Sequence, residues 1–172
     1  SRGSVVVIRG PFPELRTISQ KAFYRFSGFL EFDAWGCDVL SGLGQSAFGN
    51  LESAEQGSTV SFRGQMPALE VINAKCFEEG YNSDGQAEVY SSSNPPTFTL
   101  RFEVEAPNLK ILSVCAFRSV HGSVHLKLLL SEPVFFSSTF ASVSTLAGSR
   151  PPRIELADCD ARYADDLAYG FG

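Results

Sequence analysis

The alternation of hydrophobic and polar positions between residues 97 and 133 predicts two long β segments. Apolar side chains at positions 98, 100, 102 and 104 alternate with Thr99, Arg101, Glu103 and Glu105. One face of this segment is therefore apolar and the other polar, as in a half-buried strand, and the period does not fit a helix.

Two further β segments are expected just after this one. Residues 109–117 form an apolar run, and the turn-forming sequence His121-Gly122-Ser123 leads into a further alternating stretch at 123–130. Two β segments separated by a short Gly-containing turn are typical of a hairpin.

Six further strand candidates are separated by turn signals rich in Gly, Pro, Asn and Ser. They lie at 5–9, 23–34, 37–48, 59–63, 68–77 and 87–90. With the segments above, the chain has about eight or nine short strands, a number and spacing that favour an antiparallel sandwich or barrel. Helical turns are candidates only at 13–21 and 51–56, and the sequence gives no evident internal repeat. The pattern weakens beyond Pro133, where 134–146 is one more strand candidate and the last twenty or so residues are expected to form an extended surface tail.

The composition is that of a folded globular chain. Hydrophobic residues make up 44% of the 172 residues and charged residues 19%, with 15 Phe, one Trp and one Met. No apolar run approaches the length of a membrane-spanning helix. The N-terminus does not resemble a signal peptide, and the absence of an initiator Met leads us to expect a processed or trimmed chain.

The four cysteines, Cys37, Cys76, Cys115 and Cys159, are widely separated and form no C-x-x-C pair. This spacing removes the usual zinc and thioredoxin-like motifs. An even count permits two disulfides, but Cys76 and Cys115 lie in apolar, strand-like surroundings. Reduced, buried cysteines are therefore favoured over a disulfide framework.

The net charge of −5 is unevenly distributed along the chain. Residues 1–25 carry five basic side chains against Glu14 alone, whereas residues 154–172 carry five acidic side chains against Arg162 alone. A basic end can contact nucleic acid or an acidic neighbour, and an acidic tail is usually solvated. Two ordinary solvated termini are an equally good interpretation.

Candidate chemistry is sparse. His121 and His125 share a face in an extended stretch, but no third ligand lies near them in sequence, so exposed histidines are favoured over a metal site. The segment 44–49 resembles a nucleophile elbow only loosely, because its second glycine is one position too far, and we interpret it as a turn. Asp158, Asp160 and the pair at 165–166 fall in the predicted tail, where no rigid scaffold would fix a cation site. The sequence contains no phosphate-binding loop and no dinucleotide motif, so we expect no enzyme activity and no cofactor.

Several segments resemble coat proteins of picorna-like viruses, with the plant comovirus, nepovirus and cheravirus group the most similar. The sequence 23–32 is similar to an aromatic, basic, Gly-containing segment that opens a strand, and 47–51 resembles a strand end of the C-terminal jelly roll in the comovirus large coat protein. The ranges 107–115 and 119–128 resemble the last two strands of that domain. The segments follow the family's order.

The resemblance implies an all-β fold, an antiparallel eight-stranded jelly-roll β-sandwich with extended termini. Residues 1–22 would form an N-terminal arm and first strand, 23–148 the jelly-roll body, and 149–172 a C-terminal surface tail. The implied function is that of a structural capsid protein in an icosahedral shell around single-stranded RNA, located in the virion and assembled in the host cytoplasm. Its partners would be other coat protein chains and genomic RNA, with no membrane.

On this interpretation Arg2, Arg9 and Arg16 are the candidates for contacts with RNA or with a neighbouring subunit. The alternative function is that of a carbohydrate- or protein-binding β-sandwich module. A carbohydrate module would need exposed Trp or Tyr near paired Asp or Asn, and the one Trp, Trp35, lies just past a predicted strand end.

Overall fold

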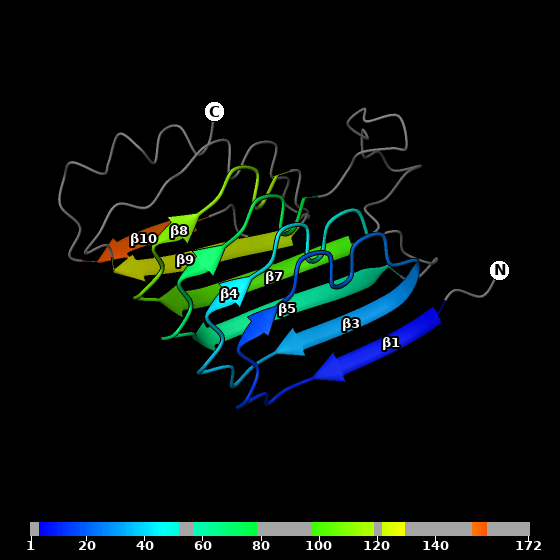
Figure 1. Cartoon of the computed structure of the whole chain (residues 1–172), viewed down its shortest axis with the longest axis horizontal. Helices are drawn as coiled ribbons and strands as arrows, with labels where there is room; N and C mark the ends of the chain where they lie inside the picture. Colours follow the sequence, from blue (N-terminus) through cyan, green and yellow to red (C-terminus); the bar gives the residue numbers. More distant parts are fainter. Residues whose placement is uncertain (1–3, 52–56, 79–97, 119–121, 130–152, 158–172) are drawn as a thin grey trace.

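The described chain forms two β-sheets that lie face to face, and every strand pair in both sheets is parallel (Figure 1). The computed structural model describes residues 4–51, 57–78, 98–118, 122–129 and 153–157. The larger sheet has the strand order β1 (Ser4–Arg9), β3 (Gly28–Ala34), β5 (Ser58–Gln65), β7 (Phe98–Ala106), β9 (Gly122–Leu129) and β10 (Arg153–Ala157). The smaller sheet has the order β2 (Thr17–Ile18), β4 (Gly42–Leu43), β6 (Val71–Ile72) and β8 (Ile111–Leu112).

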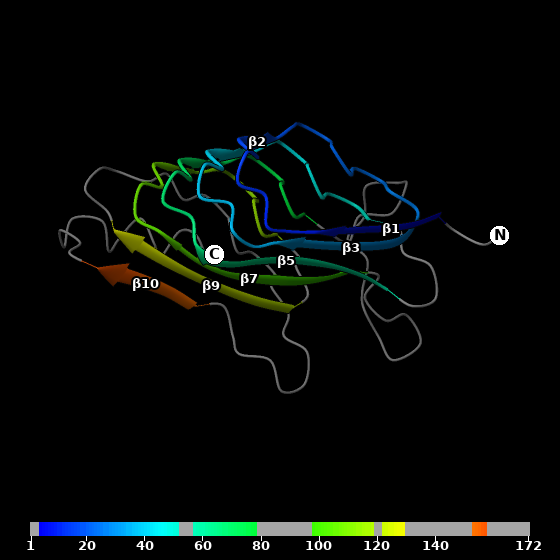
Figure 2. The same ribbon diagram turned by 90° about the horizontal axis from the view of Figure 1, so that it is seen from below.

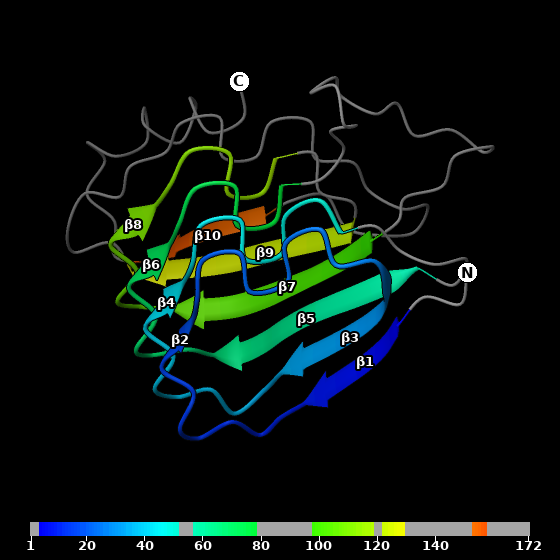
Figure 3. The same cartoon turned by 45° about the vertical axis from the view of Figure 1, so that its right-hand side comes forward.

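The chain winds between the two sheets as a solenoid. The long strands β1, β3, β5 and β7 each lead through a turn into a short strand of the opposite layer, as Figures 2 and 3 show from two further directions. We call these units the first coil (4–27), second coil (28–51), third coil (57–78) and fourth coil (98–118). Each strand pairs with the strand in the same position of the neighbouring coil, so the coils stack along one direction.

The predicted antiparallel jelly-roll β-sandwich is wrong, because every strand pair in the described residues is parallel. A two-residue hairpin reverses the chain direction, whereas parallel neighbours need a longer crossover connection. Here the crossover is the short strand with its flanking turns. The expectation of a viral-coat β-sandwich depended on the jelly roll and loses its structural basis with it.

The predicted hairpin around 121–123 is also wrong. Only Ile111–Leu112 of the apolar run 109–117 is a strand, and this strand lies in the smaller sheet. The next long strand, β9, pairs with β7 and not with the 109–117 segment. The runs 37–48 and 68–77 behave in the same way, each contributing one short strand followed by a turn. Their apolar side chains fill a curved part of the coil and do not line a long strand.

The candidates in the larger sheet are confirmed. The segments expected at 5–9, 59–63, 97–105 and 123–130 correspond to β1, β5, β7 and β9, and β3 lies inside the range 23–34. β10 falls at the start of the range expected to be a tail. The candidates at 87–90 and 134–146 lie outside the described residues, as does the helical-turn candidate 51–56 except for its first residue. The other helical-turn candidate, 13–21, contains turns and β2.

The structure reveals an internal repeat that was not expected from the sequence. The side chains Ile18, Leu43, Ile72 and Leu112 occupy the same position in β2, β4, β6 and β8. A Leu lies three residues before each of these side chains. A Phe lies five residues after each of them, and the residue directly before that Phe is Ala or Cys. The four phenylalanines are Phe23, Phe48, Phe77 and Phe117. Their unequal intervals, widened by the segments 52–56 and 79–97, hide the repeat from a search for a fixed period.

The turn before each of these phenylalanines has a conserved backbone geometry from coil to coil. Lys21, Ser46, Lys75 and Cys115 occupy the same turn position, each with a left-handed φ of 51–57°. Their amides bond to the next coil: Lys21 N–H donates to Gln45 O at 2.9 Å, and Ser46 N–H donates to Ala74 O at 3.1 Å. A non-Gly residue pays a modest strain energy in this region, which the coil-to-coil hydrogen bonds offset.

Two columns of phenylalanine rings fill the space between the sheets. The first column stacks Phe48 on Phe23 at 5.1 Å and on Phe77 at 5.5 Å, with ring planes within 13° of parallel. The second column consists of Phe32, Phe62 and Phe102, at centroid distances of 5.5 and 5.6 Å. Because stacked strands are about 4.8 Å apart, side chains at equivalent positions must meet ring on ring. Edge-on contacts between the columns, such as Phe48 with Phe62 at 5.9 Å, join them into one core.

We predict that Phe48→Ala destabilises the protein by roughly 3–5 kcal/mol, because Phe48 is fully buried and contacts rings of both columns. Phe48→Leu should cost less, since it keeps much of the buried volume. Urea unfolding followed by circular dichroism measures both. Ile111→Ala is the control, because Ile111 is 44% exposed, and a loss at Phe48 no larger than at Ile111 would contradict the role of the columns.

Candidate binding surface

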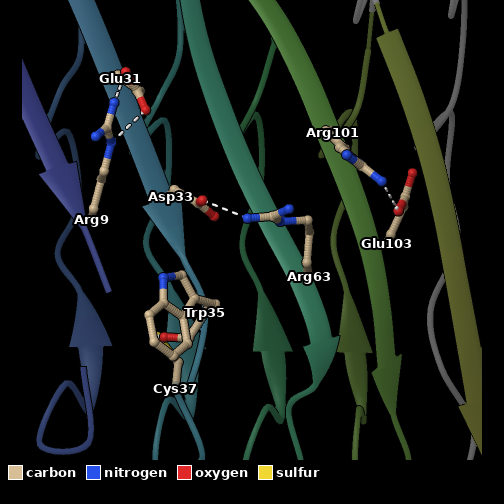
Figure 4. Close-up of polar contacts among 8 residues, drawn as sticks. All are labelled: Arg9, Glu31, Asp33, Trp35, Cys37, Arg63, Arg101 and Glu103. Atoms are coloured by element: carbon tan, nitrogen blue, oxygen red, sulfur yellow. Dashed lines mark hydrogen bonds and ion pairs between the residues drawn. The ribbon is translucent and has the colours of Figure 1, made fainter. Parts of the chain in front are cut away.

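The outward face of the larger sheet carries a network of opposite charges across five strands. Arg9 on β1 forms a bidentate pair with Glu31 on β3, with N–O distances of 2.7 and 3.0 Å. Asp33 on β3 pairs with Arg63 on β5, as Figure 4 shows. We call this surface, formed by the outward side chains of β1, β3, β5, β7 and β9, the charged face.

The network continues across the second half of the sheet. Arg101 pairs with Glu103 on the same strand at 2.9 Å (Figure 4). Glu105 on β7 pairs with Lys127 on β9 at 3.4 Å, and these two residues are opposite each other in the strand register. The side chains of these two pairs are 37–51% exposed. The charged face therefore holds four basic and four acidic side chains in ion pairs, of which Glu31 and Asp33 are half-buried and the other six are exposed.

The ion pairs shift the protonation equilibria of their members. The hydrogen bond from Arg9 lowers the pKa of Glu31, and the hydrogen bond from Arg101 lowers the pKa of Glu103. The charges of His125 and Arg63 lower the pKa of Glu103 further. Conversely, Glu103 raises the pKa of Arg101, with a smaller contribution from Asp33, which lies two strands away on β3. The pairs are thus electrostatically coupled across strands and do not act in isolation.

Two polar atoms without a hydrogen-bond partner lie at the centre of the charged face. Asp33 and Ser61 are opposite each other on β3 and β5. The Oδ1 atom of Asp33 and the Oγ atom of Ser61 are both buried and make no hydrogen bond. A buried polar atom of this kind costs free energy until a partner is supplied. A bound molecule that reached this point would find an acceptor and a hydroxyl group.

Trp35 adds an exposed aromatic ring next to these charges. It follows β3, two residues beyond Asp33, and is 45% exposed (Figure 4). Large exposed aromatic side chains beside Arg are the residue types that most often dominate binding energies at interfaces. A shallow depression of about 230 Å³ lies at the other end of the face, lined by residues that include Glu103, Glu105, His125 and Lys127.

The opposite layer has a second hollow of about 440 Å³ over β2, β4 and β6. Its floor is formed in part by Gly42 and Gly44, where other coils carry larger side chains. At Gly44 a Cβ atom would approach the backbone of residues 18–20 to within 2.4 Å, so close stacking of the coils requires glycine here. The need for glycine at this position explains why the hollow exists, so ligand binding is not required to explain it.

The structure separates the predicted contact residues. Arg9 lies on the charged face in its pair with Glu31, whereas Arg16 lies in the first coil outside that face. The main-chain carbonyl of Arg16 accepts hydrogen bonds from the N–H and the hydroxyl of Ser41. Arg2 lies outside the described residues. Arg9 and Arg16 therefore do not form one basic patch.

The other sequence candidates yield no reactive site in the described residues. The segment 44–49 directly follows β4 and forms a turn, as predicted. His125 lies on β9 facing the charged side, while His121 and the aspartates at 158, 160, 165 and 166 lie outside the described residues. Among the described residues no group of three or more His, Cys, Asp or Glu is placed to hold a metal ion. The described part of the chain contains no helix that is long and apolar enough to cross a membrane.

The charged face was not identified from the sequence. The alternation at 99–105 indicated the polar side of one strand, but nothing in the sequence showed that Glu31, Asp33 and Arg63 would lie beside it. Only parallel pairing brings these three strands into one surface.

Comparisons with known proteins give no relative for this chain: no family model, no curated protein and no solved structure matches it.

The pKa shifts predict a pH dependence of stability. Because the pKa values of Glu31 and Glu103 are lower in the folded chain, their pairs stabilise it above the unfolded value of about 4.3. This contribution is lost as the pH falls through the folded pKa values. We expect the melting temperature to drop in this acidic range, and to drop less in the variant Glu31→Gln/Glu103→Gln. Calorimetry at a series of pH values measures both, and identical curves for the two proteins would refute the coupling.

A second prediction concerns the cysteines, which the structure places in the core as free thiols at positions 37, 76 and 115. Burial raises the pKa of the Cys37 and Cys76 thiols, and only the thiolate reacts readily with alkylating reagents. We expect both thiols to resist iodoacetamide in the native protein and to react on unfolding in urea. Mass spectrometry of the modified peptides measures this, and rapid native labelling of Cys76 would contradict the buried placement.

Proposed function

We propose that this chain is a protein-binding repeat domain whose charged face recognises a partner protein. The observation that carries the proposal is the continuous set of exposed, oppositely charged side chains across β1 to β9, with Trp35 beside it. Solenoids present extended surfaces built from equivalent positions of successive coils, and these surfaces commonly serve recognition. Alternating charges favour a partner of complementary pattern and reject others by like-charge contacts.

The balance of charges disfavours nucleic acid as the partner. Binding to a phosphate backbone requires an excess of Lys and Arg on one surface. The four cations of the charged face are matched by four anions, and Arg9 is held by Glu31 in a bidentate pair. A polyanion would have to displace these carboxylates from their partners.

A carbohydrate ligand is less well supported than a protein. Sugar-binding sites combine an exposed aromatic ring with polar groups that are available for hydrogen bonding. Trp35 supplies the ring, but the neighbouring Asp33 carboxylate is engaged by Arg63. The remaining oxygen of Asp33 and the hydroxyl of Ser61 are buried and offer little area to a sugar.

The capsid function implied by the sequence resemblance is untested, as are the virion location and the coat-protein partners. Its main support was the expected jelly roll, in which antiparallel sheets of neighbouring subunits tile a shell. The parallel solenoid removes that support, so we do not propose a capsid role. The expectation that the chain is not an enzyme also stays a prediction, and the proposal concerns binding alone.

The test is whether a single charge reversal on the charged face abolishes a specific protein interaction. Immobilised full-length chain is used to retain proteins from an extract of its native source, and each retained protein is then purified and titrated against the chain. We expect Arg101→Glu to weaken binding by about tenfold or more, because it breaks the pair with Glu103 and places two acids together. Binding should also weaken as the salt concentration rises.

Lys110→Glu is the matched control. Lys110 lies on the other layer, is 53% exposed and pairs with Glu70, so the change in charge is the same while the charged face stays intact. Equal loss in both variants, or no protein bound by purified components, would overturn the proposal. Binding of a glycan array that is lost in Trp35→Ala would favour the carbohydrate function in its place.

A further inference from the structure

The first coil is less covered than the coils that follow it. Its inward apolar side chains are only partly buried: Val6, Ile8, Phe12, Leu15, Phe23 and Phe26. The residues at the equivalent positions of the second coil, such as Leu30 opposite Val6 and Phe48 above Phe23, are completely buried. The difference arises because, within the described part of the chain, an inner coil is covered on both sides and the first coil on one.

β1 is also apolar on its outward face. Val5 and Val7 are 70% and 50% exposed. In the next strand the outward residue opposite Val7 is the charged Glu31. A parallel strand with apolar side chains on both faces is typical of a strand that is covered on both faces. Among the described residues β1 pairs with β3 alone, so its other edge presents backbone N–H and C=O groups that a further strand can bind.

The two ends of the stack differ in charge. The first coil carries Arg9, Arg16, Lys21 and Arg25 against Glu14. Lys21 and Arg25 flank the ring of Tyr24 at 5.4 and 5.6 Å. At the other end of the sheet, β10 pairs within the described part of the chain with β9 only. The sequence that follows β10 is acidic, with Asp158, Asp160, Asp165 and Asp166 against Arg162.

We propose that the exposed end of the first coil binds a second copy of this chain, which adds its β10 edge parallel to β1. β10 runs in the same direction as all the other strands of its sheet, so such a copy continues the sheet without reversal. The addition pairs the free edge of β1 and covers the half-buried inward side chains, as the second coil is covered by its neighbours. The first coil is basic and the sequence that continues from β10 is acidic, so opposite charges favour this head-to-tail pairing over the pairing of two like ends.

This contact is heterologous, because the two surfaces that meet are different. Each copy that binds exposes a new first-coil end or a new β10 edge. The association therefore does not stop at a dimer, and the mean mass rises continuously with protein concentration.

Sedimentation velocity of the full chain over a wide range of concentrations tests this inference. We expect the wild type to form a series of oligomers, and Val6→Lys/Ile8→Lys to weaken association by at least about a hundredfold. These inward positions would become as buried as Leu30 and Phe32 of the second coil, so two buried charges would be left without partners. Thr59→Lys is the matched control. Thr59 is an exposed outward residue on an inner strand, so this variant should associate as the wild type does.

Asp158→Asn/Asp160→Asn tests the contribution of opposite charges to the association. It should weaken association by about tenfold, and high salt should reduce the difference from the wild type. A wild type that stays monomeric at all concentrations would overturn the inference, and a mass that stops at the dimer would replace it with a symmetric pairing of two β1 edges. Circular dichroism verifies that each variant is folded. An equal loss of association in the β1 variant and in Thr59→Lys would also overturn the inference.

Discussion

In-register parallel stacking of the coils is the constraint on which the rest of this structure depends. When strands pair in parallel without slipping, each residue lies about 4.8 Å from its equivalents in the coils above and below. The side chains of a column must therefore tolerate copies of their own kind as neighbours. Phenylalanine does so well, because offset parallel rings attract each other and still bury their whole area. The column through Phe48 stacks in this way, whereas neighbouring rings of the column through Phe62 are tilted by 38° and 46°, and the two columns together account for many of the Phe residues in this chain.

The same constraint acts in the opposite sense on the outward face. Like charges that are directly opposite on neighbouring strands destabilise a sheet, so a column of identical charged residues is excluded. Arg9 is opposite Asp33, and Arg63 is opposite Glu103. The alternation of sign is thus required by the stacking itself, and it produces a surface that is nearly neutral in sum and strongly patterned in detail. Such a surface is suited to recognising the charge pattern of a protein.

Local information in the sequence was enough for the strands but not for their arrangement. The alternation around Phe102 identified β7, and the β-branched run at 5–9 identified β1, since both features depend on neighbouring residues. Strand direction depends on what connects the strands, and here the connections were misread. The apolar runs through Leu43, Ile72 and Leu112 have the composition of strands because their side chains enter the same core, yet the backbone curves after two residues. Without the strand direction, Glu31, Asp33 and Arg63 could not be assigned to one surface.

Stacking of this kind contains no signal that ends it. An antiparallel sandwich closes its hydrophobic faces on each other, but each coil of a solenoid offers the next coil an apolar layer and an open edge, so the last layer needs polar side chains to remain in water. The first coil lacks such protection at Phe12, Leu15 and Phe23, which are only partly covered, and Val5 and Val7 extend the apolar surface onto the outward face. On the inner strands the outward positions carry charges, which keep the flat face soluble. The distribution of charged and apolar side chains thus separates two kinds of surface, one that remains in contact with water and selects partners by charge, and one whose burial would lower the free energy of the stack.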